Sequence, residues 1–277
     1  MKLNPGNVLA TTLKYLSLLL GCLIALLPLL VVFIASFKTE KQFYNTPIFS
    51  LPNGLNFQNY VEAFTDGLML QGFWNTLIIV VFACAGSILV GSMAAYVLSR
   101  FSFKINKLVS GLFLLAALIP TISTQVATFR IVSGLHLFNK IGSNILLGMG
   151  TDVISIYIFM QFLSGIPRDL DEAALMDGAS FLTIYWTVIF PLLKPAIATV
   201  LILRIVAIYN DFYTPFLYMP GKGLGVISTS LFRFIGPFNA HWQVICAGVV
   251  ITIIPTLIMF LFLQKYIYNG FTQGSVK

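Results

Sequence analysis

The stretch FWNTLIIVVFACAGSILVGSMAAYVL, residues 73–98, has no charged side chain and is long enough to cross a lipid bilayer as a helix. A bilayer core is spanned by about 20 apolar residues in helical form. Small residues recur at every fourth position, so that they share one helix face: Ala83, Ser87, Gly91 and Ala95. Such a face lets two membrane helices approach closely. We expect the neighbouring helix to belong to the same chain, with a second subunit as the alternative.

The composition of the whole chain agrees with this stretch. The 277 residues are 58% hydrophobic and only 9% charged, and the mean hydropathy is +0.93. Soluble domains have about 25% charged residues, and disordered chains are poor in apolar ones. The composition therefore excludes a disordered chain and an ordinary soluble enzyme, and it predicts an all-α integral membrane protein.

Apolar segments that could span a bilayer occur six times along the chain. They cover residues 15–36, 73–98, 109–129, 145–163, 196–217 and 243–266. Positive charge beside the spans indicates the cytoplasmic side, and the short loop from Arg100 to Lys107 has three basic residues and no acidic one. Because the number of spans is even, we expect both termini in the cytoplasm.

The net charge of +7 is better explained by orientation in the membrane than by nucleic-acid binding. The basic residues lie in loops beside the apolar segments, and no basic run is interleaved with loop aromatics, as a single-strand binding surface would require. The expected surroundings are therefore a lipid bilayer, and no nucleic-acid partner is predicted.

Sequence motifs for catalysis or metal binding are absent. The two histidines, His136 and His241, lie in different loops, and the three cysteines are far apart within apolar segments. The chain has no His-Glu-x-x-His, no Cys-x-x-Cys and no phosphate-binding Gly-x-x-x-x-Gly-Lys-Ser/Thr sequence. We expect a chain with no catalytic residues, no metal site and no cofactor of its own.

The predicted cytoplasmic loop over residues 164–194 has the pattern of a short helix, a turn and a second helix. Pro167 suits a helix start, and the acidic residues that follow it favour the positive end of the helix dipole. Gly178 permits a turn that a continuous helix would resist, and a second helix can begin at Phe181. Small residues in the first helix leave room for a partner to dock closely.

A longer pattern within this loop is specific to one family of membrane proteins. It comprises Glu172, Ala173, Ala174, Asp177, Gly178, Ala179 and Pro191. The pattern resembles the Glu-Ala-Ala loop of the permeases in binding-protein-dependent ABC importers. Residues 209–216, YNDFYTPF, resemble the fifth-span motif of the carbohydrate permeases, with Tyr209 in place of the usual Trp. The C-terminal residues 264–277 resemble the tail of the MalG-like member of the sugar permease pair.

The resemblance implies a type I importer permease with six transmembrane helices in a bacterial cell membrane. It implies as partners a homologous second permease, two copies of a cytoplasmic ATPase that binds ATP and Mg²⁺, and an extracellular sugar-binding protein. The loop around Glu172 would be gripped by the ATPase, and the tail, here with Gln273 and Gly274, would reach the ATPase interface. The implied cargo is a sugar, specifically an oligosaccharide of the raffinose or multiple-sugar type, and a permease for a non-sugar solute is the alternative.

Four polar residues near the end of the fifth predicted span are candidates to line a transport path: Arg204, Asn210, Asp211 and Tyr213. Arg204 and Asp211 are about two helical turns apart, so they lie on roughly one face. Intramembrane charge is costly and usually faces a cavity or a partner. The alternative is that these residues anchor the helix end and pack against a neighbour.

The expected organisation has three parts. An N-terminal transmembrane helix and outer loop cover residues 1–72, and a core of five transmembrane helices covers residues 73–266. A cytoplasmic tail follows over residues 267–277. The last outer loop, residues 219–242, is rich in Gly and Pro, and the resemblance implies that it probes the binding protein.

Overall fold

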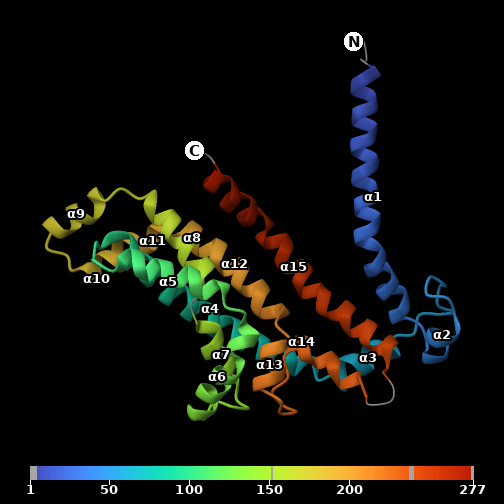
Figure 1. Ribbon diagram of the computed structural model, residues 1–277. Coiled ribbons are helices and arrows are strands. Elements are labelled where there is room, and N and C mark those ends of the chain that lie inside the picture. The colour runs from blue at the N-terminus through green and yellow to red at the C-terminus, as the bar shows by residue number, and fades with distance from the viewer. Residues whose placement is uncertain (1–4, 151, 237–239, 276–277) are drawn as a thin grey trace. The chain divides into compact units, whose positions relative to one another are not determined.

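The computed structural model describes residues 5–150, 152–236 and 240–275, and this part of the chain is mostly helical (Figure 1). Pairing of the β type in the described residues is limited to one isolated bridge between Ile235 and Ala240, and the all-α prediction is confirmed. In chain order the elements are α1 (Pro5–Ser36), α2 (Glu40–Asn45), α3 (Gln58–Thr65), α4 (Met69–Arg100), α5 (Asn106–Leu118), α6 (Thr121–Gly134), α7 (Ile141–Met149), α8 (Val153–Ser164), α9 (Asp169–Met176), α10 (Phe181–Ile184), the π-helix η1 (Tyr185–Ile189), α11 (Phe190–Leu192), α12 (Lys194–Asn210), α13 (Tyr213–Tyr218), α14 (Ile227–Ser230), the 3₁₀-helix η2 (Leu231–Phe234) and α15 (Trp242–Ser275).

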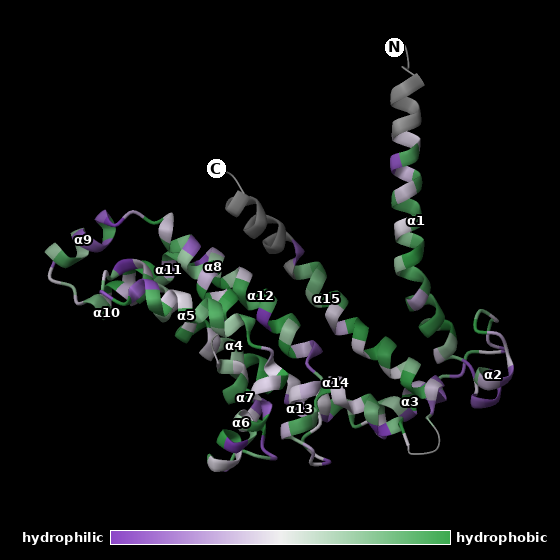
Figure 2. Ribbon diagram, viewed as in Figure 1, coloured by the Kyte–Doolittle hydropathy of each residue, from purple (hydrophilic) through white to green (hydrophobic). Residues whose placement is uncertain are grey.

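Helices within the described residues account for four to six membrane spans. Four are long and apolar enough by themselves: Thr11–Ser36, Met69–Arg100, Ile141–Ser164 and Trp242–Phe262. Two further spans are formed if the bent pairs α5–α6 and α10–α12 are each counted as one. Apolar residues run along most of α1, and hydrophilic residues gather around α2 and α9 (Figure 2).

The third predicted span, over residues 109–129, is divided between two helices, α5 and α6. The chain bends by 102° between α5 and α6. Ile119 between them is extended, with ψ of 118°, and Pro120 follows it. A residue before proline is disfavoured in helical conformation because the proline ring clashes with it, so the helix ends there.

The fifth predicted span, over residues 196–217, is too long. Helix α12 ends at Asn210, and Asp211 is extended, with ψ of 109°. A separate short helix, α13, then begins at Tyr213. The chain also bends by 74° between Phe181–Leu192 and α12. The sixth predicted span begins at the observed start of α15, but α15 continues beyond residue 266 to Ser275.

The stripe of small residues on α4 packs within the chain. Ala83, Ser87 and Ala95 have no exposed surface, and Gly91 is also buried. The preferred interpretation, packing against helices of the same chain, is confirmed. By contrast, only 6% of the most apolar stretch of α1 is buried within the chain. Its apolar side chains are therefore free to contact lipid or another protein.

The chain divides into two compact units. One unit comprises Met1–Met69 and Leu231–Leu257. It contains a buried cation, Lys38, which is 2% exposed. Its Nζ donates to four oxygens of the following loop: Thr46 Oγ1 (3.3 Å), Pro47 O (2.9 Å), Ile48 O (3.4 Å) and Ser50 Oγ (3.0 Å). Asn59 Nδ2 donates to Ser36 O and Lys38 O, which fixes α3 to the end of α1.

The other unit comprises Leu70–Ser230 and Ile258–Lys277. Its core joins α4, α8 and the segment from α10 to α12 through buried side chains such as Tyr96, Phe159 and Ile189. A hydrogen bond of 2.7 Å between the Ser92 and Tyr185 hydroxyls lies inside this core. Within this unit α9 lies at one end, and α6, α7 and α13 lie at the other (Figure 1).

Candidate functional site

Helix α9 ends in a defined cap that only glycine accommodates easily. Gly178 has φ of +85°, a left-handed conformation that side-chain-bearing residues rarely adopt. Its N–H donates to Leu175 O at 2.9 Å, and Ala179 N–H donates to Ala174 O at 3.0 Å. These two bonds form a Schellman motif, which satisfies the last carbonyls of the helix. The predicted helix and glycine turn are therefore present in the structure.

The start of α9 is attached to the end of α4. Arg100 Nε lies 3.1 Å from Asp171 Oδ2, and their side chains are 8% and 13% exposed. Arg100 Nη2 also donates to Ile166 O at 2.9 Å. In return, Arg168 Nη2 donates to Ser99 O at 3.0 Å. Two arginines thus bind α9 and α4 together from both sides of the junction.

The outward surface of α9 is acidic and apolar. None of its residues is buried. Glu172, Ala173 and Asp177 are exposed, and Met176 is 88% exposed. Ala174 and Ala179 instead face inward and pack partly against the core. The loop pattern therefore divides into two groups. Glu172, Ala173 and Asp177 lie on the exposed surface, and Ala174 and Ala179 pack against the core of the unit.

The segment after α9 contains a π-helical turn before a proline. Ser180 caps α10 by accepting from Thr183 N–H at 3.2 Å. Phe190 N–H then bonds to Tyr185 O, five residues back. Pro191, exposed on α11, has no N–H and needs no acceptor in the preceding turn. This arrangement leads the chain into α12 at the observed bend.

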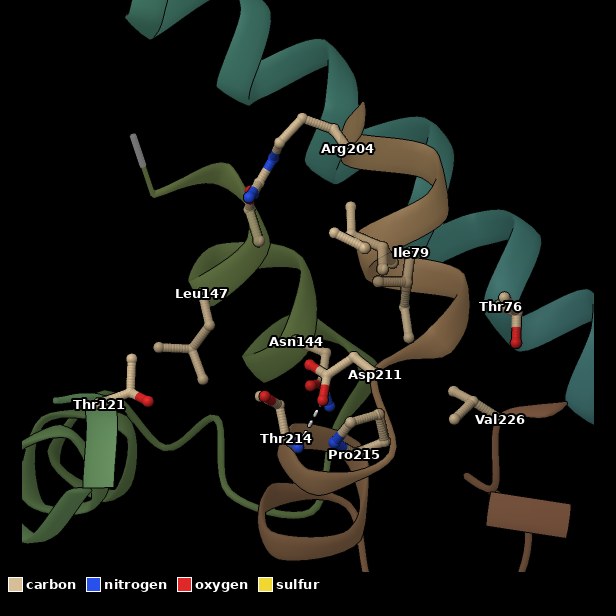
Figure 3. Close-up of a pocket in the computed structure, with 13 residues that line it drawn as sticks. Thr76, Ile79, Thr121, Asn144, Leu147, Arg204, Asp211, Thr214, Pro215 and Val226 are labelled. Carbon is tan, nitrogen blue, oxygen red and sulfur yellow. Dashed lines mark hydrogen bonds between the residues drawn. The ribbon is translucent and has the colours of Figure 1, made fainter. Parts of the chain in front are cut away.

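A cavity of about 340 Å³ lies at the opposite end of the same unit (Figure 3). It is lined from α4, α6, α7, α12, α13 and the loop before α14, by Thr76, Ile79, Thr121, Asn144, Leu147, Gly148, Arg204, Ala207, Ile208, Asp211, Thr214, Pro215 and Val226. The α4 residues Ile79 and Arg100 are separated by roughly 30 Å along the helix. One helix therefore connects the cavity with the base of α9.

Two of the four predicted path residues, Arg204 and Asp211, line this cavity. The Arg204 guanidinium donates to Gly148 O through Nη2. Asp211 Oδ1 accepts from Thr214 N–H at 3.0 Å. The two charges are therefore held by separate neutral partners.

The other two predicted path residues, Asn210 and Tyr213, do not line the cavity. Asn210 is exposed, and its Nδ2 donates to Val206 O of its own helix at 2.9 Å. The Tyr213 hydroxyl donates to Gln125 Oε1. Burial and, to a lesser degree, the Tyr213 phenol raise the pKa of the Tyr218 phenol.

Asn144 is a lining residue that the sequence analysis missed. It is 5% exposed, and its Nδ2 has no hydrogen-bond partner within the described residues. Arg204 Nε is in the same situation. Asn144 directly precedes the apolar segment predicted over residues 145–163, and nothing at that position in the sequence marks it as a lining residue.

The glycine-rich turn beside the cavity is fastened by three side-chain amides. Gln71 Nε2 donates to Gly223 O at 2.7 Å, and Asn75 Nδ2 donates to Gly225 O at 2.9 Å. Gly221 N–H donates to Asn139 Oδ1 at 2.8 Å. This part of the predicted outer loop is bound to the unit. The tail candidates Gln273 and Gly274 lie in α15, and their surroundings lie outside the described part of the structure.

Sequence relatives cover nearly the whole chain. A probable starch degradation products transport system permease protein, AmyC, of Thermoanaerobacterium thermosulfurigenes is 33% identical over 95% of this chain and 97% of its own length. A melibiose/raffinose/stachyose import permease protein, MelC, of Bacillus subtilis is 30% identical over 91% of each chain.

Solved structures share the fold. A bacterial ABC transporter involved in the import of the acidic polysaccharide alginate matches with a TM-score of 0.83 and 23% identity, over 96% of this chain and 99% of that chain. A bacterial alginate ABC transporter in complex with an alginate pentasaccharide-bound periplasmic protein matches with a TM-score of 0.66 and 19% identity, over 93% and 94% of the two chains. The type I importer permease fold is thereby confirmed.

The family model for the inner membrane component of binding-protein-dependent transport systems matches residues 87–272. That range includes α9, its glycine cap and every cavity-lining residue except those at the start of α4. Members of this family are transport subunits, in agreement with the predicted non-catalytic role. This chain belongs to the family of inner membrane components of binding-protein-dependent transport systems.

Proposed function

We propose that this chain is a permease subunit of an ATP-driven importer that carries an oligosaccharide into the cell. The observation that carries the proposal is α9, an exposed helix anchored by a buried ion pair to a helix that reaches the cavity. The printed names of the relatives describe import of starch products and of melibiose, raffinose and stachyose. Those names support a sugar cargo over the non-sugar alternative.

The exposed surface of α9 is the proposed docking site for the ATPase. Glu172, Ala173 and Asp177 provide the contact surface, and Gly178 sets the direction in which the chain leaves it. In this proposal two copies of a cytoplasmic ATPase bind ATP and Mg²⁺, and this chain contributes no catalytic group. Ala174, Ala179 and Pro191 hold the docking surface in place.

Motion of α9 would reach the cavity through α4. The pair of Arg100 and Asp171 joins α9 to the last residue of α4, and Thr76 and Ile79 of α4 line the cavity. A helix transmits displacement along its axis because its backbone hydrogen bonds keep it stiff. ATP-driven closure of the ATPases would thus change access to the cavity.

The remaining partners follow from the same proposal. A homologous second permease would complete the transport path, and an extracellular binding protein would deliver the sugar to the cavity end of the unit. The alginate transporter complex with its periplasmic protein supports such a delivery partner. With α9 on the cytoplasmic side, both termini are proposed to lie in the cytoplasm, where Gln273 and Gly274 would approach the ATPase.

The test uses the full complex of this chain, its paired permease, the ATPase and the binding protein in lipid vesicles. Binding protein with one sugar of a panel of raffinose, maltotriose and arabinotriose is expected to stimulate ATP hydrolysis and uptake. Glu172→Lys is expected to abolish copurification of the ATPase. Asp66→Lys, which changes an exposed acid outside α9, is the matched control and is expected to leave assembly intact.

Two results would contradict the proposal. Intact ATPase assembly and uptake in Glu172→Lys would remove α9 as the docking site. Stimulation by a non-sugar solute alone, from a well-assembled complex, would remove the sugar cargo.

A further inference from the structure

The loop over residues 46–57, which follows α2, exposes large apolar side chains although it lies outside the candidate membrane spans. The exposed fraction is between 60% and 75% for Ile48, Phe49, Leu51, Leu55 and Phe57. The loop has no charged residue, whereas Figure 2 shows α2, just before it, in the hydrophilic colour. Exposed apolar patches mark surfaces that contact another protein or a membrane.

Both ends of this loop are tied to the residues that directly follow α1. At the start of the loop, Lys38 Nζ donates to Pro47 O at 2.9 Å. At its end, Asn56 N–H donates to Phe37 O at 3.3 Å. The loop is therefore fixed against the end of α1, and its apolar side chains have a defined position relative to that helix.

A row of three aromatic rings joins the exposed surface of α1 to the loop. The rings of Phe33 and Phe37 meet edge to face with centroids 5.3 Å apart, and those of Phe37 and Phe57 meet in the same way at 5.5 Å. Phe33 on α1 is 52% exposed, and Phe57 at the end of the loop is 60% exposed. The apolar surface of the membrane helix therefore continues onto the loop.

The attachment to α1 also sets the depth of the loop relative to a bilayer. The candidate span of α1 ends at Ser36. Only the Lys38 side chain and one hydrogen bond separate the Pro47 carbonyl from the second residue after that span. The headgroup region is roughly 5–8 Å thick on each side, half the difference between the whole bilayer and its hydrocarbon core. The start of the loop therefore lies at the height of the lipid headgroups.

The position of Lys38 keeps positive charge away from the outer surface of the loop. A lysine beside a membrane span usually extends its ammonium group into water. Lys38 is instead 2% exposed, and four oxygens of the loop lie within 3.4 Å of its Nζ. Because these oxygens solvate the cation from inside, the loop presents an uncharged apolar surface. Phe and Leu side chains on such a surface suit the boundary between headgroups and acyl chains.

We propose that the loop over residues 46–57 is a membrane-surface anchor, whose apolar side chains insert at the headgroup boundary of the leaflet beside the end of α1. The occupant is lipid and not a second protein, because the apolar surface of the loop continues that of a helix whose most apolar stretch is only 6% buried. The anchor fixes how deep α1 lies in the bilayer. The inference depends neither on the proposed sugar cargo nor on the docking of the ATPase.

The experiment places one nitroxide spin label at a time on the full complex, in vesicles of phosphatidylethanolamine and phosphatidylglycerol. Native cysteines are replaced by alanine, and Leu51→Cys is labelled, with Ile48→Cys as a second site in the loop. Access of oxygen, which concentrates in lipid, is compared with access of a charge-neutral nickel chelate, which stays in water. Leu23→Cys, on the exposed surface of α1, is the lipid control, and Lys41→Cys, an exposed position on α2, is the water control. The ratio of oxygen access to nickel access at both loop sites is expected to exceed that at Lys41 several-fold and to approach that at Leu23.

Two results would overturn the anchor. Nickel access at both loop sites equal to that at Lys41 would place the loop in water. Low access of both agents at both loop sites would mean that another protein covers the loop. Sugar uptake by the same complexes reports separately on the proposed function, since a complex with lipid-exposed loop labels that transports no sugar contradicts the cargo and supports the anchor.

Discussion

The same unit contains two arginine–aspartate couples that are built in opposite ways. At the base of α9, Arg100 and Asp171 form an ion pair of 3.1 Å with little exposed surface. At the cavity, Arg204 bonds to Gly148 O and Asp211 bonds to Thr214 N–H. The described ion pairs do not include one between Arg204 and Asp211.

This difference separates a mechanical contact from a binding surface. Opposite charges that lie directly against each other hold the two helices that carry them together. Charges that are held apart by neutral partners keep hydrogen-bonding capacity for a molecule that enters between them. Helix α9 has the first arrangement, and the cavity has the second.

The largest expected effect comes from breaking the direct pair. Asp171→Ala leaves the buried Arg100 without its counter-ion, and removing one partner of a buried pair costs about 3–5 kcal/mol. We expect sugar uptake to fall by more than about a hundredfold, since 1.4 kcal/mol is a factor of ten. Uptake in vesicles and ATPase copurification measure the loss.

Asp169→Ala is the control, because Asp169 is an exposed acid in the same first turn of α9. The double variant Arg100→Met with Asp171→Leu removes both charges and is expected to recover part of the activity. Equal uptake in Asp171→Ala and Asp169→Ala would show that the ion pair does not hold α9.

An intermediate effect is expected at the separated couple. Asp211→Asn keeps an oxygen for Thr214 N–H but removes the negative charge and one acceptor from the cavity. We expect uptake to fall about tenfold at low sugar concentration, or ~1.4 kcal/mol. ATPase copurification should be unchanged, since the variant lies far from α9. A loss of assembly in Asp211→Asn, equal to that in Asp171→Ala, would remove the distinction between the two couples.

The smallest effect is expected at the cap of α9. The Cβ added in Gly178→Ala would meet no atom within 4 Å. The loss of stability in this variant therefore comes only from the left-handed backbone conformation. That cost is about 1 kcal/mol for a residue with a side chain. We expect ATPase copurification to weaken by no more than about fivefold, measured by titration of the ATPase. A complete loss of copurification would mean that the cap, and not the ion pair, sets the position of α9.

The long apolar segments could be predicted from the sequence, but the positions at which helices break within them were predicted less accurately. The spans that begin near residues 73 and 243 match α4 and α15 because an unbroken apolar run has one stable form in a bilayer. Pro120 lies inside the third predicted span, and membrane helices tolerate proline, but the chain bends there by 102°. Asp211 ends α12 early because its carboxylate accepts from Thr214 N–H and begins a new helix.

The loop pattern predicted the glycine turn of α9, but not what anchors the helix. Arg100 and Asp171 are distant in the sequence, and nothing local marks Asp171 as the inward-facing acid rather than Glu172. Asn144 was missed for a similar reason, since its importance comes from a cavity lined by several separate helices. Contacts between distant segments depend on packing, which a single sequence does not display.

The glycine-rich turn over residues 221–225 has a consequence for divergence among such proteins. The amides that fasten it bind backbone carbonyls and one N–H, groups that mutation of the turn's own side chains largely leaves in place. The exception is Gly221, where a Cβ would lie 2.7 Å from Asn139 Oδ1. Selection can therefore vary the chemistry that the turn presents while its shape is inherited unchanged.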